Sequence, residues 1–261
     1  MELTIDGKKI KADKGQFLLD VATANGIHIP TLCHHPGVAP WGGCRLCIVE
    51  ISHPDWHGWW KLVTSCLYPA EDKLVVDTKS EKVMQTRTVI LDLLLARCPD
   101  SPEIQTLARS YGIEHTTFQP RKDADTCILC GLCVRVCEAV GASAISTMGR
   151  GIDKMVDVRY ESDDYAACVG CLACATNCPT NAIPYEQTES SRTIWKRNFD
   201  LVFCADCGTP LGTPQQLELY VKKTGLPHSY FEKCDTCSRK DTAIRFSKVV
   251  FAQGEDTLRH Q

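Results

Sequence analysis

Eight cysteines in the middle of the chain form two copies of one spacing. In each copy three cysteines are separated from one another by two residues, and a fourth follows after three intervening residues. Three thiolates in one short loop can bind three irons of a cubane, and the fourth iron needs a thiolate from elsewhere. The spacing therefore predicts two 4Fe–4S clusters, in which the last cysteine of each run ligates the cluster of the other run. The expected ligands are Cys127, Cys130, Cys133 and Cys178 for one cluster, and Cys168, Cys171, Cys174 and Cys137 for the other. Zinc knuckles or disulfides are the alternative, but zinc sites rarely chain four cysteines in this way.

A second group of cysteines lies nearer the N-terminus, with ten, two and eighteen residues between its members. The group consists of Cys33, Cys44, Cys47 and Cys66. Four thiolates can hold a 2Fe–2S cluster, and the glycines at 42 and 43 would let backbone N–H groups approach its sulfides. A zinc site is the alternative.

The last four cysteines form two Cys-x2-Cys pairs, Cys204 with Cys207 and Cys234 with Cys237. Two converging pairs give a tetrahedral site of four sulfurs, which suits zinc or a single iron and less often a cubane. The distance between the pairs exceeds the usual zinc-ribbon spacing. We expect a structural zinc or iron here, with a redox-active centre as the alternative.

The composition limits the class of protein. A chain of 261 residues suits one to three domains with modest cores. Its seventeen cysteines are an odd number, and the N-terminus lacks the apolar core of a signal peptide, so the thiols are expected to be metal ligands in a reducing compartment. No apolar run is long enough to cross a membrane, and a formal net charge of −3 argues against a nucleic-acid partner. A cytoplasmic location is therefore predicted.

The elements that must position these cysteines indicate a mixed α+β fold. Asp6-Gly7 predicts a hairpin over residues 3–11, followed by a helix over 16–24, which is how a β-grasp sheet begins. Capping residues predict helices starting at 81, 102 and 214, the last ended by Gly225. Apolar runs predict a hairpin over 144–158, and residues 182–185 repeat its first strand.

We therefore expect four parts in the order of the sequence. Residues 1–78 form a β-grasp 2Fe–2S domain, and 79–120 a short helical connector. Residues 121–190 form a ferredoxin domain with two 4Fe–4S clusters, and 191–261 a small tail with the four-cysteine metal site.

The N-terminal cysteine pattern resembles a known family. Plant-type ferredoxins have four residues between their first two ligands, whereas the loop here has ten. The longer loop, with residues 29–33 (IPTLC), 43–50 (GCRLCIVE) and 65–66 (SC), resembles the N-terminal ferredoxin domain of the large iron–sulfur subunit of respiratory complex I. The same domain occurs in the diaphorase iron–sulfur subunit of NAD-linked NiFe hydrogenases and in FeFe hydrogenases. The tail is similar to the C-terminal extension of ferredoxin-like subunits of formate hydrogenlyase-type complexes.

The connector departs from that resemblance. The family carries a His-x3-Cys-x2-Cys-x5-Cys site for a further 4Fe–4S cluster in this place, and here only Cys98 remains. One thiol cannot hold a cubane, so we expect this cluster to be lost, Cys98 to be a buried thiol, and the flanking domains to pack closer or in another arrangement.

The resemblance implies an electron-transfer subunit of a hetero-oligomeric oxidoreductase. It would link a flavin/NAD(P)H-binding subunit to a separate catalytic subunit, with a NiFe hydrogenase as the first choice. Formate dehydrogenases, tungsten or molybdenum oxidoreductases and aromatic-acyl-CoA reductases are alternatives of the same type. The fully thiolate-ligated clusters and the lack of a Gly-x-Gly-x-x-Gly motif predict neither catalytic residues nor a dinucleotide site of the chain's own. A free ferredoxin-like carrier, or an iron–sulfur sensor or scaffold, is the alternative from another class.

Overall fold

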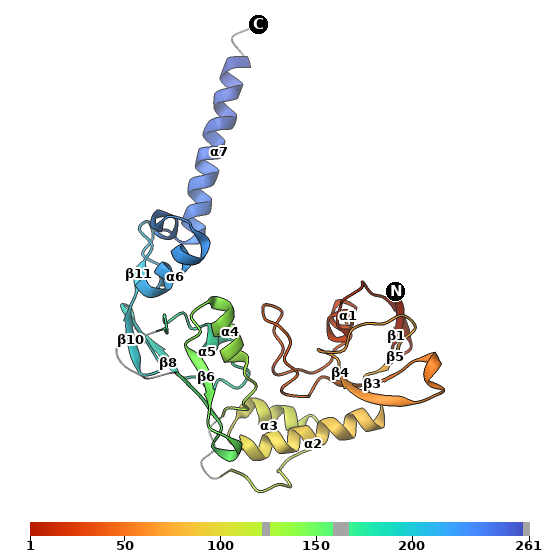
Figure 1. Ribbon diagram of the computed structural model, residues 1–261. Coiled ribbons are helices and arrows are strands. Elements are labelled where there is room, and N and C mark those ends of the chain that lie inside the picture. The colour runs from red at the N-terminus through yellow and green to blue at the C-terminus, as the bar shows by residue number, and fades with distance from the viewer. Residues whose placement is uncertain (122–125, 159–166, 258–261) are drawn as a thin grey trace. The chain divides into compact units, whose positions relative to one another are not determined.

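The computed structural model describes residues 1–121, 126–158 and 167–257, with side chains up to residue 247 (Figure 1). The chain forms two compact units. The first comprises Met1–Val140, Ile145–Val158 and Ala173–Pro184, and the second Gly141–Ala144, Arg159–Leu172 and Tyr185–Gln261. Each unit is described by itself, and the predicted boundaries of the four parts stay predictions.

The first unit begins with a five-stranded mixed sheet of order β2-β1-β5-β3-β4. Its strands are β1 (Glu2–Ile5), β2 (Lys8–Lys11), β3 (Ile48–Ser52), β4 (Trp60–Thr64) and β5 (Val75–Asp77), and only β1 and β5 pair in parallel. Asp6 and Gly7 both have positive φ, as the predicted two-residue turn requires. The buried face of α1 (Leu18–Ala24) shares a core with Leu3, Ile5 and Val49, so the sheet and helix form the expected β-grasp arrangement. A short 3₁₀ turn, η1 (Pro54–Trp56), lies between β3 and β4.

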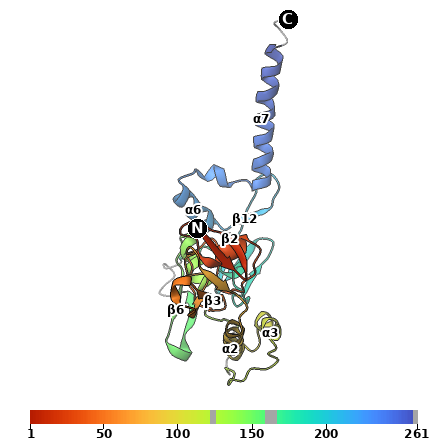
Figure 2. The same ribbon diagram turned by 90° about the vertical axis from the view of Figure 1, so that its right-hand side faces the viewer.

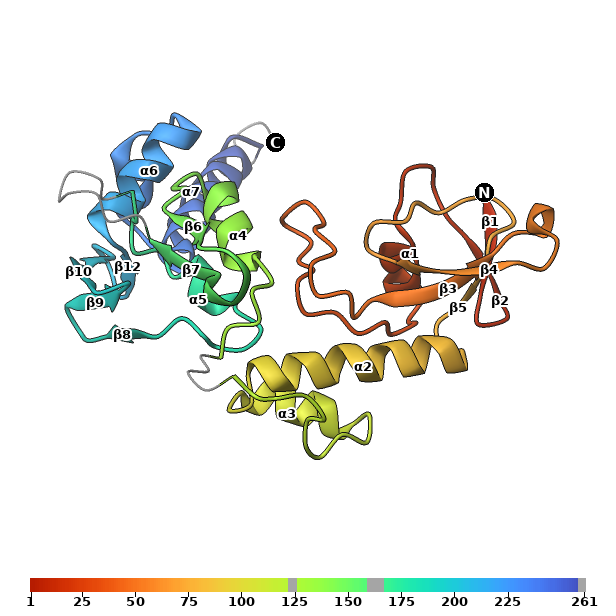
Figure 3. The same cartoon turned by 60° about the horizontal axis from the view of Figure 1, so that its bottom comes forward.

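The connector consists of two helices that pack side by side, α2 (Glu81–Arg97) and α3 (Pro102–Arg109), as Figure 3 shows. Ser80 and Ser101 cap them, since each hydroxyl accepts a hydrogen bond from a backbone N–H three residues on. Near the middle of α2 the carboxylate of Asp92 accepts hydrogen bonds from the hydroxyls of Thr116 and Thr117 at 2.6 and 2.5 Å. These bonds hold the chain that leads towards the cubane loops against α2.

The middle of the chain contains short elements around the predicted cubane ligands. In the first unit these are α4 (Leu132–Val140), the antiparallel pair β6 (Ile145–Met148) and β7 (Met155–Val158), and α5 (Ala173–Thr176), with η2 (Gly151–Asp153) between the strands. The hairpin over 144–158 is thus confirmed. The strand predicted over 182–185 is wrong, because Tyr185 begins a strand of a different sheet in the second unit.

The second unit contains a small sheet that the sequence analysis does not predict. Its strands are β8 (Tyr185–Gln187), β9 (Ser191–Ile194) and β10 (Arg197–Asp200), with β9 in the middle. The pair β11 (Val202–Phe203) and β12 (Pro210–Gly212) follows, and then come α6 (Pro214–Thr224), η3 (His228–Phe231) and α7 (Asp235–Thr257), the last a single straight helix (Figure 2). As predicted, α6 is capped by Thr213 and ended by Gly225, whose φ is 72°. Within the described ranges, no helix has the length and apolar character needed to cross a membrane.

Candidate metal centres

The four N-terminal cysteines lie together as two close pairs of thiols. Cys33, Cys44 and Cys47 lie in the loop between α1 and β3, and Cys66 follows β4. The Sγ atoms of Cys47 and Cys66 are 3.3 Å apart, and the thiols of Cys33 and Cys44 are hydrogen bonded to each other. All four side chains are buried. Two pairs of thiolates match the two irons of a 2Fe–2S cluster, so the donor set fits this group.

One thiol of each pair loses its proton readily. The Cys44 thiol, helped by the backbone N–H groups of Cys44 and Gly43, lowers the pKa of Cys33 to about 5. The Cys66 thiol in the same way lowers the pKa of Cys47 to about 6. Because the thiolate is the form that binds metals, the N–H groups at the predicted glycine turn favour iron binding here.

The loop of the 2Fe–2S site meets the first cubane loop at Gly43. A Cβ atom on Gly43 would lie 2.5 Å from the Trp41 ring and 3.6 Å from the carbonyl oxygen of Cys130. Cys33, Cys44 and Cys130 also belong to one buried core. A Cβ there would displace the Trp41 ring of the same loop, whereas its distance to the Cys130 carbonyl is an ordinary van der Waals contact. The two candidate cluster sites of the first unit are therefore neighbours.

The first cubane set is assembled around the start of α4. Cys127 and Cys130 precede the helix and Cys133 lies in its first turn, whereas Cys178 follows α5. Burial raises the pKa of the Cys130 thiol to about 11, and the nearby thiols of Cys178 and Cys127 contribute to the rise. The structure thus brings Cys178 towards the first run, which the crossed ligand set requires. The ligand assignment itself stays a prediction.

The two cubane loops repeat the same backbone conformation. Leu129 and Gly131 in the first loop have φ of 54° and 68°, and Gly170 and Leu172 at the matching positions of the second have 64° and 62°. Left-handed residues at matching positions support the internal repeat predicted from the spacing. In the second set, Cys137 and Cys174 belong to the first unit, and Cys168 and Cys171 belong to the second.

The part of the second cubane loop in the second unit is fastened to the tail. The hydroxyl of Thr213 donates a hydrogen bond of 2.5 Å to the carbonyl of Val169, and the Arg192 guanidinium donates one of 2.7 Å to that of Gly170. A Cβ on Gly170 would lie 2.9 Å from the Phe199 ring, so the loop packs tightly on β10. The sheet of β8, β9 and β10 thus supports this loop.

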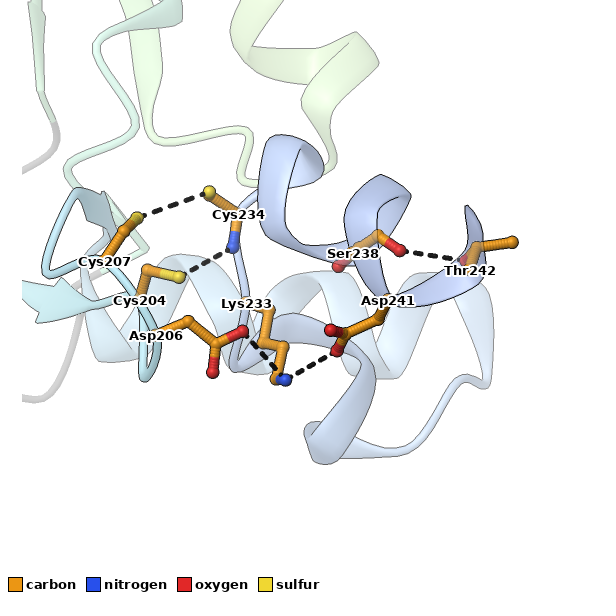
Figure 4. Close-up of polar contacts among 8 residues, drawn as sticks. All are labelled: Cys204, Asp206, Cys207, Lys233, Cys234, Ser238, Asp241 and Thr242. Atoms are coloured by element: carbon orange, nitrogen blue, oxygen red, sulfur yellow. Dashed lines mark hydrogen bonds and ion pairs between the residues drawn. The ribbon is translucent and has the colours of Figure 1, made fainter. Parts of the chain in front are cut away.

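The last four cysteines converge on one point, and Figure 4 shows three of them, Cys204, Cys207 and Cys234. Cys204 and Cys207 lie in the turn that follows β11, Cys234 directly precedes α7, and Cys237 lies in its first turn. All four sulfurs lie within 4.8 Å of one another, and those of Cys207 and Cys234 are 3.7 Å apart. Zinc–sulfur bonds of about 2.3 Å place the sulfurs of a tetrahedral site about 3.8 Å apart. A cubane separates its cysteine sulfurs more widely, because each binds a different iron. The group therefore fits a single metal ion.

Neighbouring groups stabilise this four-cysteine site. The Cys234 N–H donates a hydrogen bond of 3.3 Å to Cys204 Sγ, and this and neighbouring N–H groups lower the pKa of Cys204 to about 6. Lys233 bridges Asp206, at 2.8 Å, and Asp241, at 2.6 Å (Figure 4). The ion pairs join the turn after β11 to α7 beside the sulfurs.

Two family models match the chain, and they match the parts that carry the cysteine loops. One, described as a 2Fe-2S iron-sulfur cluster binding domain, covers residues 1–81, and the other, a 4Fe-4S dicluster domain, covers residues 123–182. This chain is an iron–sulfur protein. Neither match includes the four cysteines of the tail.

The relatives of this iron–sulfur protein are subunits of larger oxidoreductases. It is 31% identical over 235 residues to a subunit of an NADH-quinone oxidoreductase of Rhizobium meliloti (strain 1021), and the match spans 80% of this chain and 27% of that protein. NADPH-Fe(3+) oxidoreductase subunit alpha of Geobacter sulfurreducens is 32% identical, with the same coverage. A chain in the crystal structure of an NAD+-reducing [NiFe]-hydrogenase is 29% identical with a TM-score of 0.59, and the match covers 81% of this chain and 91% of that one. The protein thus spans about a quarter of its curated relatives. It is homologous to the N-terminal part of the large iron–sulfur subunit of complex I and to subunits of NAD-reducing hydrogenases.

In this iron–sulfur protein, apolar packing occupies the connector. Cys98 is fully buried beside Leu91, Leu95 and Ile104. None of the seventeen cysteines, all of which lie in the described ranges, forms a disulfide. The buried setting of Cys98 agrees with the sequence analysis.

We expect Cys98→Ser to keep every cluster. A serine hydroxyl in this apolar core should lower the free energy of unfolding by about 1–3 kcal/mol, because the hydroxyl loses its hydrogen bonds with water. Iron content and the EPR spectrum of the reduced protein should equal those of the wild type. Loss of any cluster signal would show that Cys98 is a ligand.

Sequence analysis missed the residues that hold the cluster loops, Thr213 among them. Its side chain is fully buried and also accepts a hydrogen bond from the Gln216 N–H at 3.1 Å. Thr213 caps the helix that the sequence predicts from residue 214, but nothing in the sequence indicates its bond to Val169.

Thr213→Val should weaken both the helix and the second cubane loop. We expect a loss of about 1–2 kcal/mol in the free energy of unfolding, since the cap and the bond to Val169 both disappear. One cubane should then lose iron faster under air, as followed by absorbance. Thr213→Ser keeps the hydroxyl and is the matched control. Equal iron loss in both variants would contradict a role for the hydroxyl.

Proposed function

We propose that this chain is the electron-transfer subunit of a multi-subunit oxidoreductase. It passes single electrons between a flavin/NAD(P)H module and a separate catalytic subunit, and a NiFe hydrogenase is the catalytic partner. Support comes from the similarity to a chain of an NAD+-reducing [NiFe]-hydrogenase, of which the match covers 91%.

The observation that carries this proposal is the contact between two cluster sites in the first unit. Gly43 of the 2Fe–2S loop lies against the carbonyl of Cys130, and ligand cysteines of both sites share one buried core. Electron transfer between centres slows steeply with distance, so adjacent sites are what a relay needs.

The proposed ligands leave no position for a substrate. They are Cys33, Cys44, Cys47 and Cys66 for the 2Fe–2S cluster, Cys127, Cys130, Cys133 and Cys178 for one cubane, and Cys168, Cys171, Cys174 and Cys137 for the other. Bound clusters of this kind supply one-electron transfer, whereas bond chemistry needs an open coordination site. The chain's own residues exclude water from the thiols and hold the loops in place. The chemistry therefore belongs to the partner.

We assign the tail a structural metal. Its four sulfurs lie within 4.8 Å of one another, which suits one zinc or one iron that fastens α7 to the turn after β11. This ion is not part of the relay.

Anaerobic affinity purification from the native host, with mass spectrometry of the proteins that stay bound, tests the function. We expect a flavoprotein and a nickel-containing subunit in stoichiometric amounts, and about ten irons per chain from the three clusters. A molybdenum or tungsten subunit in place of the nickel subunit would keep the relay role and replace the hydrogenase by another oxidoreductase. If the chain came down alone with its iron, it would be a mobile carrier and the subunit proposal would fail.

A further inference from the structure

An arginine binds the first cysteine of each of the three cluster loops. In every case the guanidinium donates a hydrogen bond to the backbone carbonyl of that cysteine. The pairs are Arg135 Nη2 with Cys33 at 2.5 Å, Arg97 Nε with Cys127 at 2.9 Å, and Arg197 Nη1 with Cys168 at 3.1 Å. The three arginines come from α4, the last residue of α2 and β10. Each loop is thus held by an element outside itself.

These arginines lack the usual acidic partner. None of the three forms an ion pair with a carboxylate of a described residue. In addition, Arg135 Nε and Arg97 Nη2 are buried without a hydrogen-bond acceptor in the part of the chain that the structure describes. All three side chains are half-buried, and a guanidinium that is partly removed from water without a negative neighbour is destabilising. A negative charge close to it would offset this cost.

Thiolate-ligated clusters provide that charge. Four thiolates outweigh the positive charge of the iron–sulfide core, so each cluster is an anion beside its arginine. At the 2Fe–2S site Arg135 donates its hydrogen bond to the backbone of Cys33, which is itself a proposed ligand, so its charge lies close to that site.

We infer that Arg135, Arg97 and Arg197 are positioning residues, one for each cluster loop, and that their charge raises the reduction potential of that cluster. The inference rests on the cluster assignment of the proposed function. Reduction adds a negative charge to the cluster, and a fixed cation close to a ligand stabilises the reduced form.

Arg135 has the clearest geometry for positioning its loop and for placing a charge beside it. It also donates a hydrogen bond of 2.7 Å to the carbonyl of Ala39, so one guanidinium holds two points of the 2Fe–2S loop on α4. α4 carries ligands of the first cubane, so the same contact keeps the two neighbouring sites together. Lysine would keep the charge but could not form this rigid fork.

The test is a redox titration of the full chain followed by EPR under anaerobic conditions. Arg135→Gln should reduce the equilibrium constant for reduction of the 2Fe–2S cluster about tenfold, a shift of about 59 mV to more negative potential for one electron. The cubane potentials should stay unchanged. Arg197→Gln should shift one cubane in the same direction and leave the 2Fe–2S cluster alone.

Two further variants separate charge from position. Arg135→Lys should restore the potential of the 2Fe–2S cluster but, like Arg135→Gln, lower the melting temperature, since neither side chain spans both carbonyls. Arg109→Gln is the matched control, because Arg109 lies on the exposed face of α3 and bonds Gln105. Arg109→Gln should change neither the potential of the 2Fe–2S cluster nor the melting temperature.

The outcomes distinguish this inference from the function. Unchanged potentials in Arg135→Gln and Arg197→Gln, with full iron content, would overturn the role of the arginines and leave the relay intact. An equal shift in Arg135→Lys and Arg135→Gln would also overturn the charge effect. If Arg135→Gln lost its 2Fe–2S cluster, the cubane potentials of Arg197→Gln would test the charge effect in its place. A wild-type chain without the three clusters would instead contradict the proposed function.

Discussion

Replacing Cys171 by serine should abolish electron transfer from NAD(P)H through this chain to its catalytic partner. Cys171 lies in the middle of the second cubane loop, between two residues of positive φ. A serine oxygen is a hard ligand that binds iron–sulfur clusters poorly, so the cubane should be lost or damaged. NAD(P)H-linked turnover of the purified complex should fall to background. The partner's activity with an artificial dye should be unaffected, because the dye bypasses the relay.

Cys98→Ser is the matched control for this experiment. It makes the same chemical change at a cysteine that we assign to no cluster, so NAD(P)H-linked turnover should persist. Normal physiological turnover in Cys171→Ser would show that electrons do not pass through this cubane. Loss of both activities would indicate that the complex fails to assemble, which subunit composition after gel filtration would reveal.

The features that sequence predicted correctly are local ones. The spacing predicted a domain with two 4Fe–4S clusters, and the dicluster family model matches residues 123–182, while the assignment of each ligand stays a prediction. Likewise Ser80, Ser101 and Thr213 were recognised as helix caps, since a cap bonds its own helix three residues on.

The features that sequence missed depend on distant partners. The turn between β9 and β10 has Trp195 and Lys196 at positive φ. Glycine or asparagine at these positions would have predicted a hairpin, whereas tryptophan and lysine do not. Tyr185 pairs with Ile194 instead of completing a repeat of β6. The arginines at the cluster loops bind backbone carbonyls, which every residue possesses, so no sequence pattern could identify their acceptors.

The connector helices contact the loops of the neighbouring cluster sites. Arg97, the last residue of α2, holds the first cubane loop, and Glu103 at the start of α3 accepts a hydrogen bond of 2.6 Å from Asn181, close to Cys178. Cys33 and Cys130 lie in the same core as the connector helices. The helices therefore support the neighbouring cluster sites through packing. The expectation that the flanking domains pack closer, or in another arrangement, stays a prediction.

Removing the metal from the tail should release α7 from the turn after β11 without affecting the three clusters. Binding of structural zinc supplies about 10–16 kcal/mol in small zinc-binding peptides, more than the few contacts around Cys204 and Cys234 could replace. Cys234→Ser should therefore expose residues 204–237 to limited proteolysis and raise their amide hydrogen exchange. Iron should stay at about ten atoms per chain. Ser238→Ala, one turn into α7, is the control, since its side chain does not join the sulfurs.

The same variant separates a structural ion from a redox centre. If the ion is structural, Cys234→Ser should keep the wild-type EPR spectrum and reduction potentials while the tail becomes sensitive to protease. An unchanged proteolysis pattern together with loss of an EPR signal would mean that the site carries electrons. The separation of 3.7 Å between the sulfurs of Cys207 and Cys234 favours the first result, because one tetrahedral ion spans that distance and a cubane needs more.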